Sequence, residues 1–264
     1  MKTSIELTQF DGSILKLTEK PKNIVSLVPS ITENLIQFGK IPSARTSFCI
    51  EPRKIVPNIP AIGGTKTPRV AKIISMKPDL VIANQEENIK AHVEEIQAAG
   101  IPVWITFPQT VFELPKLMRE LSSLCDDSAQ ADMWIAKTES VLKQKFQWKV
   151  KPRIATLIWK EPWMAVGKDT YTSNLIEFCG GENPIPGRYP EIAVERFKDW
   201  KIDILLLPSE PYEFESVDVE FWKPIVPQVI PICGEDILWS GPRFIDAAAS
   251  LVEICKSFEK NQLK

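Results

Sequence analysis

The chain has 264 residues, a formal net charge of −2 and 44% hydrophobic side chains, which is typical of a globular protein. Its 32 basic and 34 acidic side chains are balanced and form no basic run, which argues against a nucleic-acid-binding protein. The sequence has no apolar stretch near the roughly 20 residues of a membrane-spanning helix. Its length provides for one large domain or two small ones, each with its own core.

The N-terminal residues predict a small antiparallel flap. Asp11 and Gly12 form a pair that favours a tight hairpin turn, and apolar residues stand on both sides of it. Before this turn, residues 1–8 lack the apolar segment of a secretory leader. We therefore expect a cytoplasmic protein, or a periplasmic or extracellular one if a leader has been removed.

The first helix is predicted to begin at Ser30. Ser30 and Glu33 have the spacing of a capping box, in which both side chains accept hydrogen bonds from free backbone N–H groups at a helix start. Gly39 is placed to end this helix, because glycine readily adopts the left-handed conformation found after helix ends.

Three strand-length apolar runs of the first half have counterparts in the second half. The runs are residues 24–28, 77–83 and 101–105, matched by residues 154–158, 201–207 and 229–232. Such runs are typical of parallel strands that helices cover on both faces. Helical segments alternate with them, which indicates βαβ units. The repeated order favours two small α/β lobes over a chance similarity between short apolar runs.

One long helix is predicted between the two halves. Residues 126–150 contain neither glycine nor proline, apolar residues recur at helical spacing, and Pro152 ends the stretch. We therefore expect an N-terminal lobe at 1–125, a backbone helix at 126–150 and a C-terminal lobe at 151–264. A helix of this length would act as a strut that allows only small hinge motions.

Motifs spread over the first half carry a family resemblance. They lie at residues 11–33, 62–65, 77–83 and 98–103. With them, and with its duplicated lobes, the chain resembles the helical-backbone metal-receptor superfamily, the substrate-binding proteins of ABC importers for cobalamin, haem and ferric siderophores. The resemblance implies two Rossmann-like lobes with small parallel sheets, joined by one long α-helix, and a ligand cleft between them. The cobalamin-binding branch is the most similar, so a corrinoid or a related metal chelate is the expected ligand.

Alignment with that branch implies a set of ligand-binding residues. In this chain they are Phe48, Asn84, Trp159, Trp163, Tyr189, Glu235 and Trp239. Phe48, Trp159 and Tyr189 keep the aromatic character of the branch, whereas Asn84 departs from it. In open α/β sheets ligands lie beyond the carboxyl ends of the strands, and aromatic walls there suit a flat macrocycle. The alternative is that loop tryptophans merely cap the lobes.

Two further residues have expected roles in metal binding and transporter docking. Cys49 adjoins Phe48, and its thiolate would ligate cobalt or iron; the alternative is a small buried thiol. The family's importers are contacted by one exposed carboxylate per lobe, a position that falls on Glu195 in the second lobe and on Ala71 in the first. We expect delivery to an ABC permease through Glu195. The alternative is a cytoplasmic corrinoid, haem or siderophore carrier or sensor that no longer docks.

Enzymatic activity is not expected. The sequence has no phosphate-binding loop and no GxSxG motif, and its only histidine, His92, lies in a predicted surface helix. A lone histidine gives little basis for a Ser–His or Cys–His arrangement. We therefore expect a monomeric binding protein that requires no cofactor and binds no nucleic acid.

Overall fold

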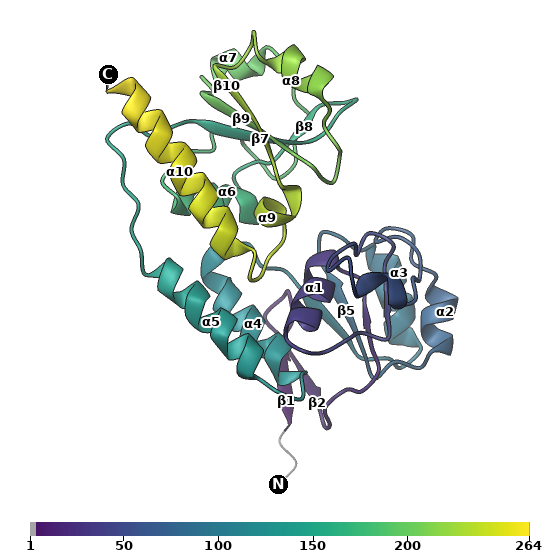
Figure 1. The fold of residues 1–264 in the computed structure, drawn as a ribbon. Helices are drawn as coiled ribbons and strands as arrows, with labels where there is room; N and C mark the ends of the chain where they lie inside the picture. The colour runs from purple at the N-terminus through teal and green to yellow at the C-terminus, as the bar shows by residue number, and fades with distance from the viewer. Residues whose placement is uncertain (1–3, 264) are drawn as a thin grey trace. The chain divides into compact units, whose positions relative to one another are not determined.

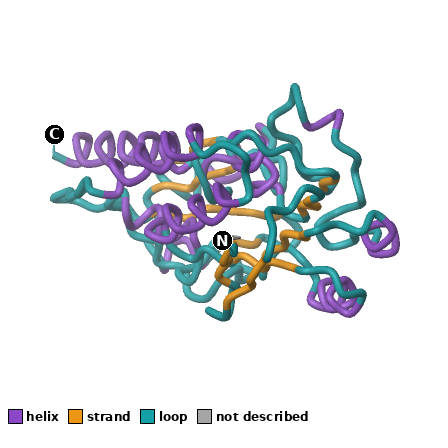
Figure 2. Tube along the Cα trace, turned by 90° about the horizontal axis from the view of Figure 1, so that it is seen from below, coloured by secondary structure: helices purple, strands orange, loops and turns teal. Residues whose placement is uncertain are grey.

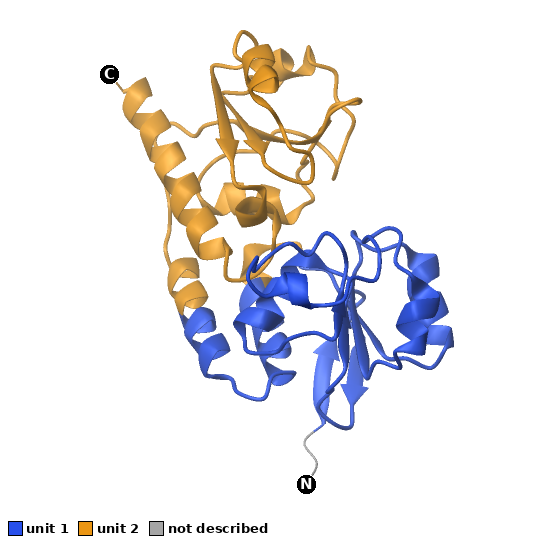
Figure 3. Cartoon of the chain, turned by 45° about the vertical axis from the view of Figure 1, so that its right-hand side comes forward, with its two compact units in different colours: residues 1–108, 114–136 blue, residues 109–113, 137–264 orange. Residues whose placement is uncertain are grey.

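The computed structural model describes residues 4–263, which form two compact units. Unit 1 comprises the described residues up to Pro108 together with Leu114–Ala136, and unit 2 comprises Gln109–Glu113 and the residues from Lys137 onward. Figure 3 shows that the change from one unit to the other falls inside a helix. Each unit contains a four-stranded sheet of its own, as the internal repeat predicts.

Unit 1 contains a parallel sheet with the strand order β4-β3-β5-β6. The strands are β3 (Ile24–Ser26), β4 (Ala44–Arg45), β5 (Leu80–Asn84) and β6 (Val103–Thr106), and the main helices are α1 (Pro29–Gln37), α2 (Val70–Ser75), α3 (Lys90–Ala98) and α4 (Leu114–Ser123), with a 3-10 turn at Val56–Asn58. Both sheet faces are buried, because Leu80 and Ile82 join a core with α1 and α4, whereas Val81 and Ala83 join one with α2 and α3. Figure 1 shows α2 and α3 on one side of β5 and α1 on the other.

The predicted hairpin is present at the start of unit 1. It consists of β1 (Ile5–Thr8) and β2 (Ile14–Leu17), which pair antiparallel. Leu7 is fully buried in the core of the unit. The indole Nε1 of Trp104 donates a hydrogen bond to the carbonyl oxygen of Thr8 at 2.8 Å. The hairpin is therefore fixed to the end of the sheet by both packing and a hydrogen bond.

The first helix begins one residue earlier than predicted. Val28 is the N-cap residue and Pro29 occupies the first turn, whereas Ser30 makes no capping bond and is buried. Proline suits this position because its φ is preset for a helix and its missing N–H is not needed there. The predicted capping box is therefore wrong. The predicted end is confirmed, since Gly39 follows the helix with φ +86°.

The helix predicted at 126–150 is shorter in the structure. Helix α5 spans Ala129–Leu142, and the chain then runs without helix or strand to β7. Phe146 and Trp148 explain the early end. The ring of Phe146 packs edge-on against another ring of unit 2, and Trp148 Nε1 donates to the carbonyl oxygen of Cys179 at 2.9 Å. Residues two apart point to different sides of a helix, so these contacts favour an extended backbone.

Unit 2 contains a sheet with the strand order β10-β9-β7-β8. The strands are β7 (Ile154–Trp159), β8 (Met164–Ala165), β9 (Ile204–Pro208) and β10 (Gln228–Ile232), and the helices are α6 (Tyr171–Phe178), α7 (Arg196–Asp199), α8 (Ser216–Trp222), α9 (Gly234–Leu238) and α10 (Phe244–Gln262). Strands β10, β9 and β7 are parallel, whereas β8 is antiparallel to β7. One sheet face packs on Phe197 and Trp222, which α7 and α8 contribute (Figure 1).

Loops connect most of these elements, as the abundance of proline predicts. Figure 2 shows them in teal between the helices and strands. The sequence has 22 proline residues, which suit short turns rather than element interiors. Within residues 4–263, none of the helices combines the length and the apolar character that crossing a membrane requires.

Candidate ligand-binding surfaces

The carboxyl ends of three parallel strands meet at one edge of the sheet in unit 2. Trp159 is the last residue of β7, Ser209 follows β9, and Cys233 follows β10. Trp159 leaves 44% of its surface exposed although it belongs to a central strand. An aromatic ring and polar groups therefore occupy the edge where open α/β sheets bind ligands.

Tyr189 lies in a bend of the segment that runs beside β8. Gly167 N donates to Arg188 O at 2.6 Å, and Ala165 N donates to Pro190 O at 3.1 Å, so this segment continues the sheet. A Cβ atom on Gly167 would lie 2.1 Å from the carbonyl oxygen of Gly187, and only glycine permits this approach. Tyr189 is 37% exposed, with β8 between its segment and the strand of Trp159.

Trp163 packs within unit 2 instead of facing solvent. Its ring stacks on Phe214 and Phe221 at centroid distances of 6.4 and 5.7 Å, and it meets Trp222 edge-on at 5.2 Å. It also packs against the core cluster of the unit. These contacts give Trp163 a packing role. They favour the alternative stated above, that loop tryptophans cap the lobes.

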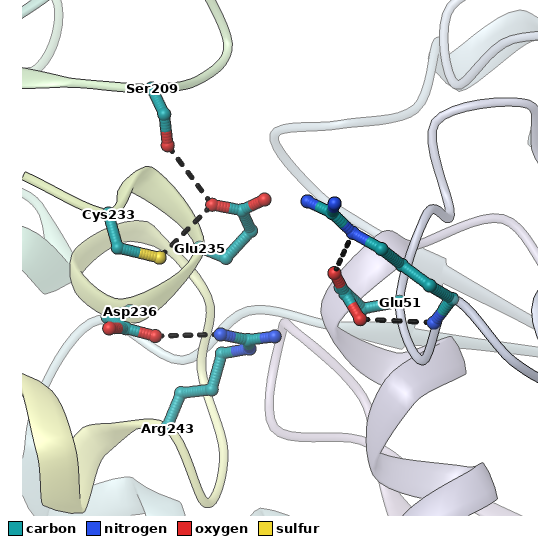
Figure 4. Close-up of polar contacts among 7 residues, drawn as sticks. Glu51, Ser209, Cys233, Glu235, Asp236 and Arg243 are labelled. Atoms are coloured by element: carbon teal, nitrogen blue, oxygen red, sulfur yellow. Dashed lines mark hydrogen bonds and ion pairs between the residues drawn. The ribbon is translucent and has the colours of Figure 1, made fainter.

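A group of polar side chains follows β9 and β10 (Figure 4). The Oε2 atom of Glu235 accepts hydrogen bonds from Ser209 Oγ at 3.2 Å and from Cys233 Sγ at 3.3 Å. Beside it, Arg243 forms an ion pair with Asp236 at 2.7 Å. Sequence reasoning missed Ser209 and Cys233, although each directly follows a predicted strand.

Glu235 is ionised at neutral pH in this group. Burial raises the pKa of its carboxyl, but hydrogen bonds from its own N–H, Cys233 and Ser209, with the nearby charge of Arg243, bring the pKa below its ordinary value. Burial and the neighbouring carboxylates raise the pKa of the Cys233 thiol to about 12. Cys233 therefore keeps its proton and donates it to Glu235.

Trp239, the residue expected to form an aromatic wall, is mostly buried. It ends α9 and is only 6% exposed, and the guanidinium carbon of Arg243 lies 5.5 Å from its ring centroid. A ring that is buried beneath a charged side chain has little area to offer a ligand. This burial gives no support to the expected aromatic wall at Trp239, which stays a prediction.

In unit 1 the same edge of the parallel sheet carries Phe48 and Asn84. Phe48, in the loop after β4, is 60% exposed, and the same loop holds Glu51, which accepts a hydrogen bond from Arg53 Nε at 2.9 Å. Asn84 ends β5, and its Oδ1 accepts from Glu86 N at 2.8 Å. Phe48 is available for contact, whereas the amide oxygen of Asn84 supports the turn after β5.

Cys49, the residue expected to ligate a metal, is a buried thiol in this structure. It is fully buried, and its Sγ lies 3.1 Å from Thr32 Oγ1 and 3.2 Å from Thr46 Oγ1. Burial raises the pKa of this thiol, so the thiolate that a metal requires is disfavoured. Across residues 4–263, the structure has no cluster of three or more His, Cys, Asp or Glu side chains suited to a metal ion. The burial and the raised pKa favour the alternative of a small buried thiol, and ligation by Cys49 stays a prediction.

Glu195 and Ala71, the two positions expected to face a permease, are both exposed. Glu195 precedes α7 and makes no side-chain capping bond to it. Ala71 lies on α2 in unit 1. An exposed carboxylate is thus available on unit 2, while unit 1 has a methyl group at the matching position.

Comparisons with known proteins agree with this architecture. The family described as "Periplasmic binding protein" matches residues 24–220. The vitamin B12-binding protein of Vibrio parahaemolyticus is 22% identical over 279 residues, covering 100% of this chain and 98% of the relative. That of Photorhabdus laumondii is 24% identical, covering 88% and 87%.

Solved structures show the same fold. The periplasmic vitamin B12 binding protein BtuF of Vibrio cholerae superposes with a TM-score of 0.77 at 16% identity, covering 90% of this chain and 98% of that one. The periplasmic heme-binding protein RhuT from Roseiflexus sp. RS-1 gives 0.74 at 20% identity, with the same coverage. The predicted α/β class with parallel sheets is thereby confirmed.

The expected cytoplasmic location is wrong. The matched family is one of periplasmic binding proteins, and the match extends over both units. The alternative of a cytoplasmic carrier or sensor required the same location, so it is set aside as well.

Proposed function

Since the chain belongs to the periplasmic binding protein family, we propose that it captures a corrinoid such as cobalamin, or a related metal chelate, for an ABC importer. Members of this family bind solutes and do not transform them, in agreement with the expectation that the chain is not an enzyme. The relatives that cover nearly the whole chain are vitamin B12-binding proteins by name, which supports a corrinoid as the ligand.

Exposed aromatic rings at the carboxyl edge of the sheet in unit 2 carry this proposal. Trp159 is 44% exposed, whereas Trp222 and Phe197 in the same unit are 0% and 1% exposed. Unit 2 therefore leaves the ring of Trp159 largely outside the core that Trp222 and Phe197 help to fill. A flat macrocycle binds to such a ring by stacking and burial of apolar area.

The charge beside this edge favours a corrinoid over haem. Glu235 is ionised at neutral pH, and the nearby guanidinium of Arg243 is already paired with Asp236 at 2.7 Å. The rim of a corrinoid carries amides that donate hydrogen bonds to a carboxylate. Haem carries propionates, which an unneutralised carboxylate would repel. We therefore rank the corrinoid first among the metal chelates.

Delivery would use the exposed carboxylate of Glu195. Charges at an interface steer encounter and fix register, so Glu195 would pair with a basic side chain of the permease. Ala71 supplies no charge on unit 1, and docking through that unit would be weaker as a result.

A binding screen tests the proposal. The purified protein is incubated separately with cyanocobalamin, haemin and a ferric siderophore, and each mixture is passed through gel filtration with detection at the visible band of the ligand. We expect cyanocobalamin to co-elute with the protein and haemin to bind less tightly. Failure of every chromophore to co-elute would contradict the proposal.

A charge-neutral variant tests the ligand preference. Glu235→Gln keeps the size of the side chain and removes its charge, so haemin should gain affinity relative to cyanocobalamin. Glu253→Gln, an exposed carboxylate in the middle of α10 of the same unit, serves as the matched control and should leave the ratio of the two dissociation constants unchanged. An equal ratio in Glu235→Gln and wild type would argue against the role of Glu235.

A further inference from the structure

A second aromatic ring lies beside Trp159 at the carboxyl edge of the sheet in unit 2. Trp159 ends β7, and Tyr212 belongs to the loop after β9, the strand that pairs with β7 in parallel. The two ring centroids are 5.5 Å apart and the ring planes meet at 71°. In an edge-to-face pair each ring covers only part of its neighbour, so the remaining faces stay available. Tyr212 is itself only partly buried.

Tyr212 is held in place by further rings. Its centroid lies 4.9 Å from that of Phe214, and Phe214 stacks on Trp163 at 6.4 Å with an interplanar angle of 14°. Trp163 in turn meets Trp222, which is fully buried. The aromatic contacts therefore continue from the core of unit 2 to Tyr212. A surface braced in this way loses little conformational freedom when it binds a partner.

The other side of the pair is also fixed. Lys160 follows Trp159 in the chain, and its Nζ forms an ion pair of 2.7 Å with Asp218, whose side chain is 3% exposed. Asp218 also accepts a hydrogen bond from Glu215 N at 2.9 Å, which ties it to the start of α8. The backbone next to Trp159 is thus anchored to the helix that carries Trp222.

The hydroxyl of Tyr212 is available for a polar contact. Within residues 4–263 it makes no hydrogen bond, although the ring is packed on two sides. Tyrosine combines a large apolar face with one polar atom, which suits a ligand whose apolar ring has a polar rim.

We propose that Tyr212 contacts the ligand and forms with Trp159 a near-perpendicular aromatic corner that accepts the edge of a flat, conjugated macrocycle. This inference rests on the proposed function. The macrocycle stacks on the open face of Trp159, its rim meets the ring of Tyr212, and the free hydroxyl donates to a polar group on that rim. A ferric siderophore lacks a flat conjugated disc and would gain little from such a corner.

Three variants test this role, with cyanocobalamin as the first probe and haemin as the second. Tyr212→Ala should weaken binding about three- to tenfold, as expected for the loss of an aromatic contact. Tyr212→Phe keeps the ring and should recover most of that loss, and the part that it does not recover measures the contribution of the hydroxyl. Phe221→Ala is the matched control, because Phe221 is 46% exposed and belongs to the same cluster, where its ring contacts Trp163 at 5.7 Å and Trp222 at 5.4 Å. It should lower thermal stability and leave the dissociation constant unchanged.

The outcomes separate this inference from the proposed function. If the wild-type protein binds a probe and Tyr212→Ala binds it equally well, the aromatic corner is refuted and the proposed function stands. If Phe221→Ala loses as much affinity as Tyr212→Ala, Tyr212 acts through packing alone and the inference is also refuted. If the wild-type protein binds neither probe nor the ferric siderophore, the proposed function fails and takes this inference with it.

Discussion

Replacing Trp159 with alanine removes the largest exposed ring at the carboxyl edge of the sheet in unit 2. Trp159 leaves 44% of its surface exposed, and a whole Trp side chain covers about 250 Å², so about 110 Å² is open to a ligand. At about 25 cal/mol per Å², complete coverage contributes about 2.7 kcal/mol and stacking on one face about half of that. Trp159→Ala should therefore weaken binding about ten- to hundredfold.

The same change should have only a small effect on folding. Trp159 loses its edge-to-face contact with Tyr212, which is worth about 1 kcal/mol, and the midpoint of thermal unfolding should fall by about 3 °C. Calorimetric titration with cyanocobalamin gives the dissociation constant, and circular dichroism gives the unfolding midpoint on the same sample.

Trp200 offers a matched control for this experiment. It lies in the same unit before β9, at the amino end of that strand, and packs on Phe197 with a centroid distance of 6.2 Å. Trp200→Ala should lower the unfolding midpoint and leave the dissociation constant unchanged. An unchanged dissociation constant in Trp159→Ala, or loss of its cooperative unfolding, would refute the assignment of Trp159 to a ligand-contacting surface.

Two further predictions concern stability. Burial raises the pKa of the Glu235 carboxyl, but its hydrogen bonds and the charge of Arg243 outweigh burial and bring the pKa below 4.5. The ionised carboxylate therefore stabilises the fold at neutral pH. This stabilisation is lost as the pH falls from 4.5 through the lowered pKa. The free energies of unfolding of wild type and Glu235→Gln, measured in urea, should therefore approach each other as the pH falls below 4.5. Parallel pH curves would contradict this. Gly167→Ala, whose Cβ would lie 2.1 Å from Gly187 O, should cost about 2 kcal/mol or more. Gly187→Ala has φ +75° and open space around its Cβ, and should cost only about 1 kcal/mol; equal costs would argue against the close approach.

The strands were predictable because their signal is local. Residues 24–28 and 154–158 are continuous apolar runs, and the structure has β3 at Ile24–Ser26 and β7 at Ile154–Trp159. A parallel strand covered on both faces must be apolar along its length, whatever packs on it. The layer of helices on each face of the sheet in unit 1 follows from the same pattern.

The fate of individual aromatic rings was not predictable in this way. Trp159 and Trp163 are four residues apart in similar loop-flanking positions, yet one is 44% exposed and the other packs on Phe214 and Trp222. These partners lie about 50 residues away in the sequence, so the residues next to Trp163 do not predict which rings it packs on. The early end of α5 has the same origin, because it depends on a contact between Trp148 and the remote Cys179.

Other parts of the candidate surface could have been found from the sequence. Tyr212 and Cys233 belong to the loops after the strands predicted at residues 201–207 and 229–232, which are β9 and β10 in the structure. The carboxyl ends of these strands lie side by side because the strands pair in parallel. Reading every loop residue after each parallel strand, and not only those that align with a family, would have included both.

The raised pKa of Cys233 has a consequence for the reaction of this thiol with oxidants. The thiolate is the form of cysteine that reacts with oxidants and disulfides, and an ordinary cysteine is a few per cent thiolate at pH 7. With a pKa of about 12, only about one Cys233 side chain in 100,000 is a thiolate at that pH. The other four cysteines, Cys49, Cys125, Cys179 and Cys255, are buried. The exposed thiol, that of Cys233, is therefore also one that reacts slowly. An oxidant in solution would therefore meet no readily ionised thiol among the five cysteines.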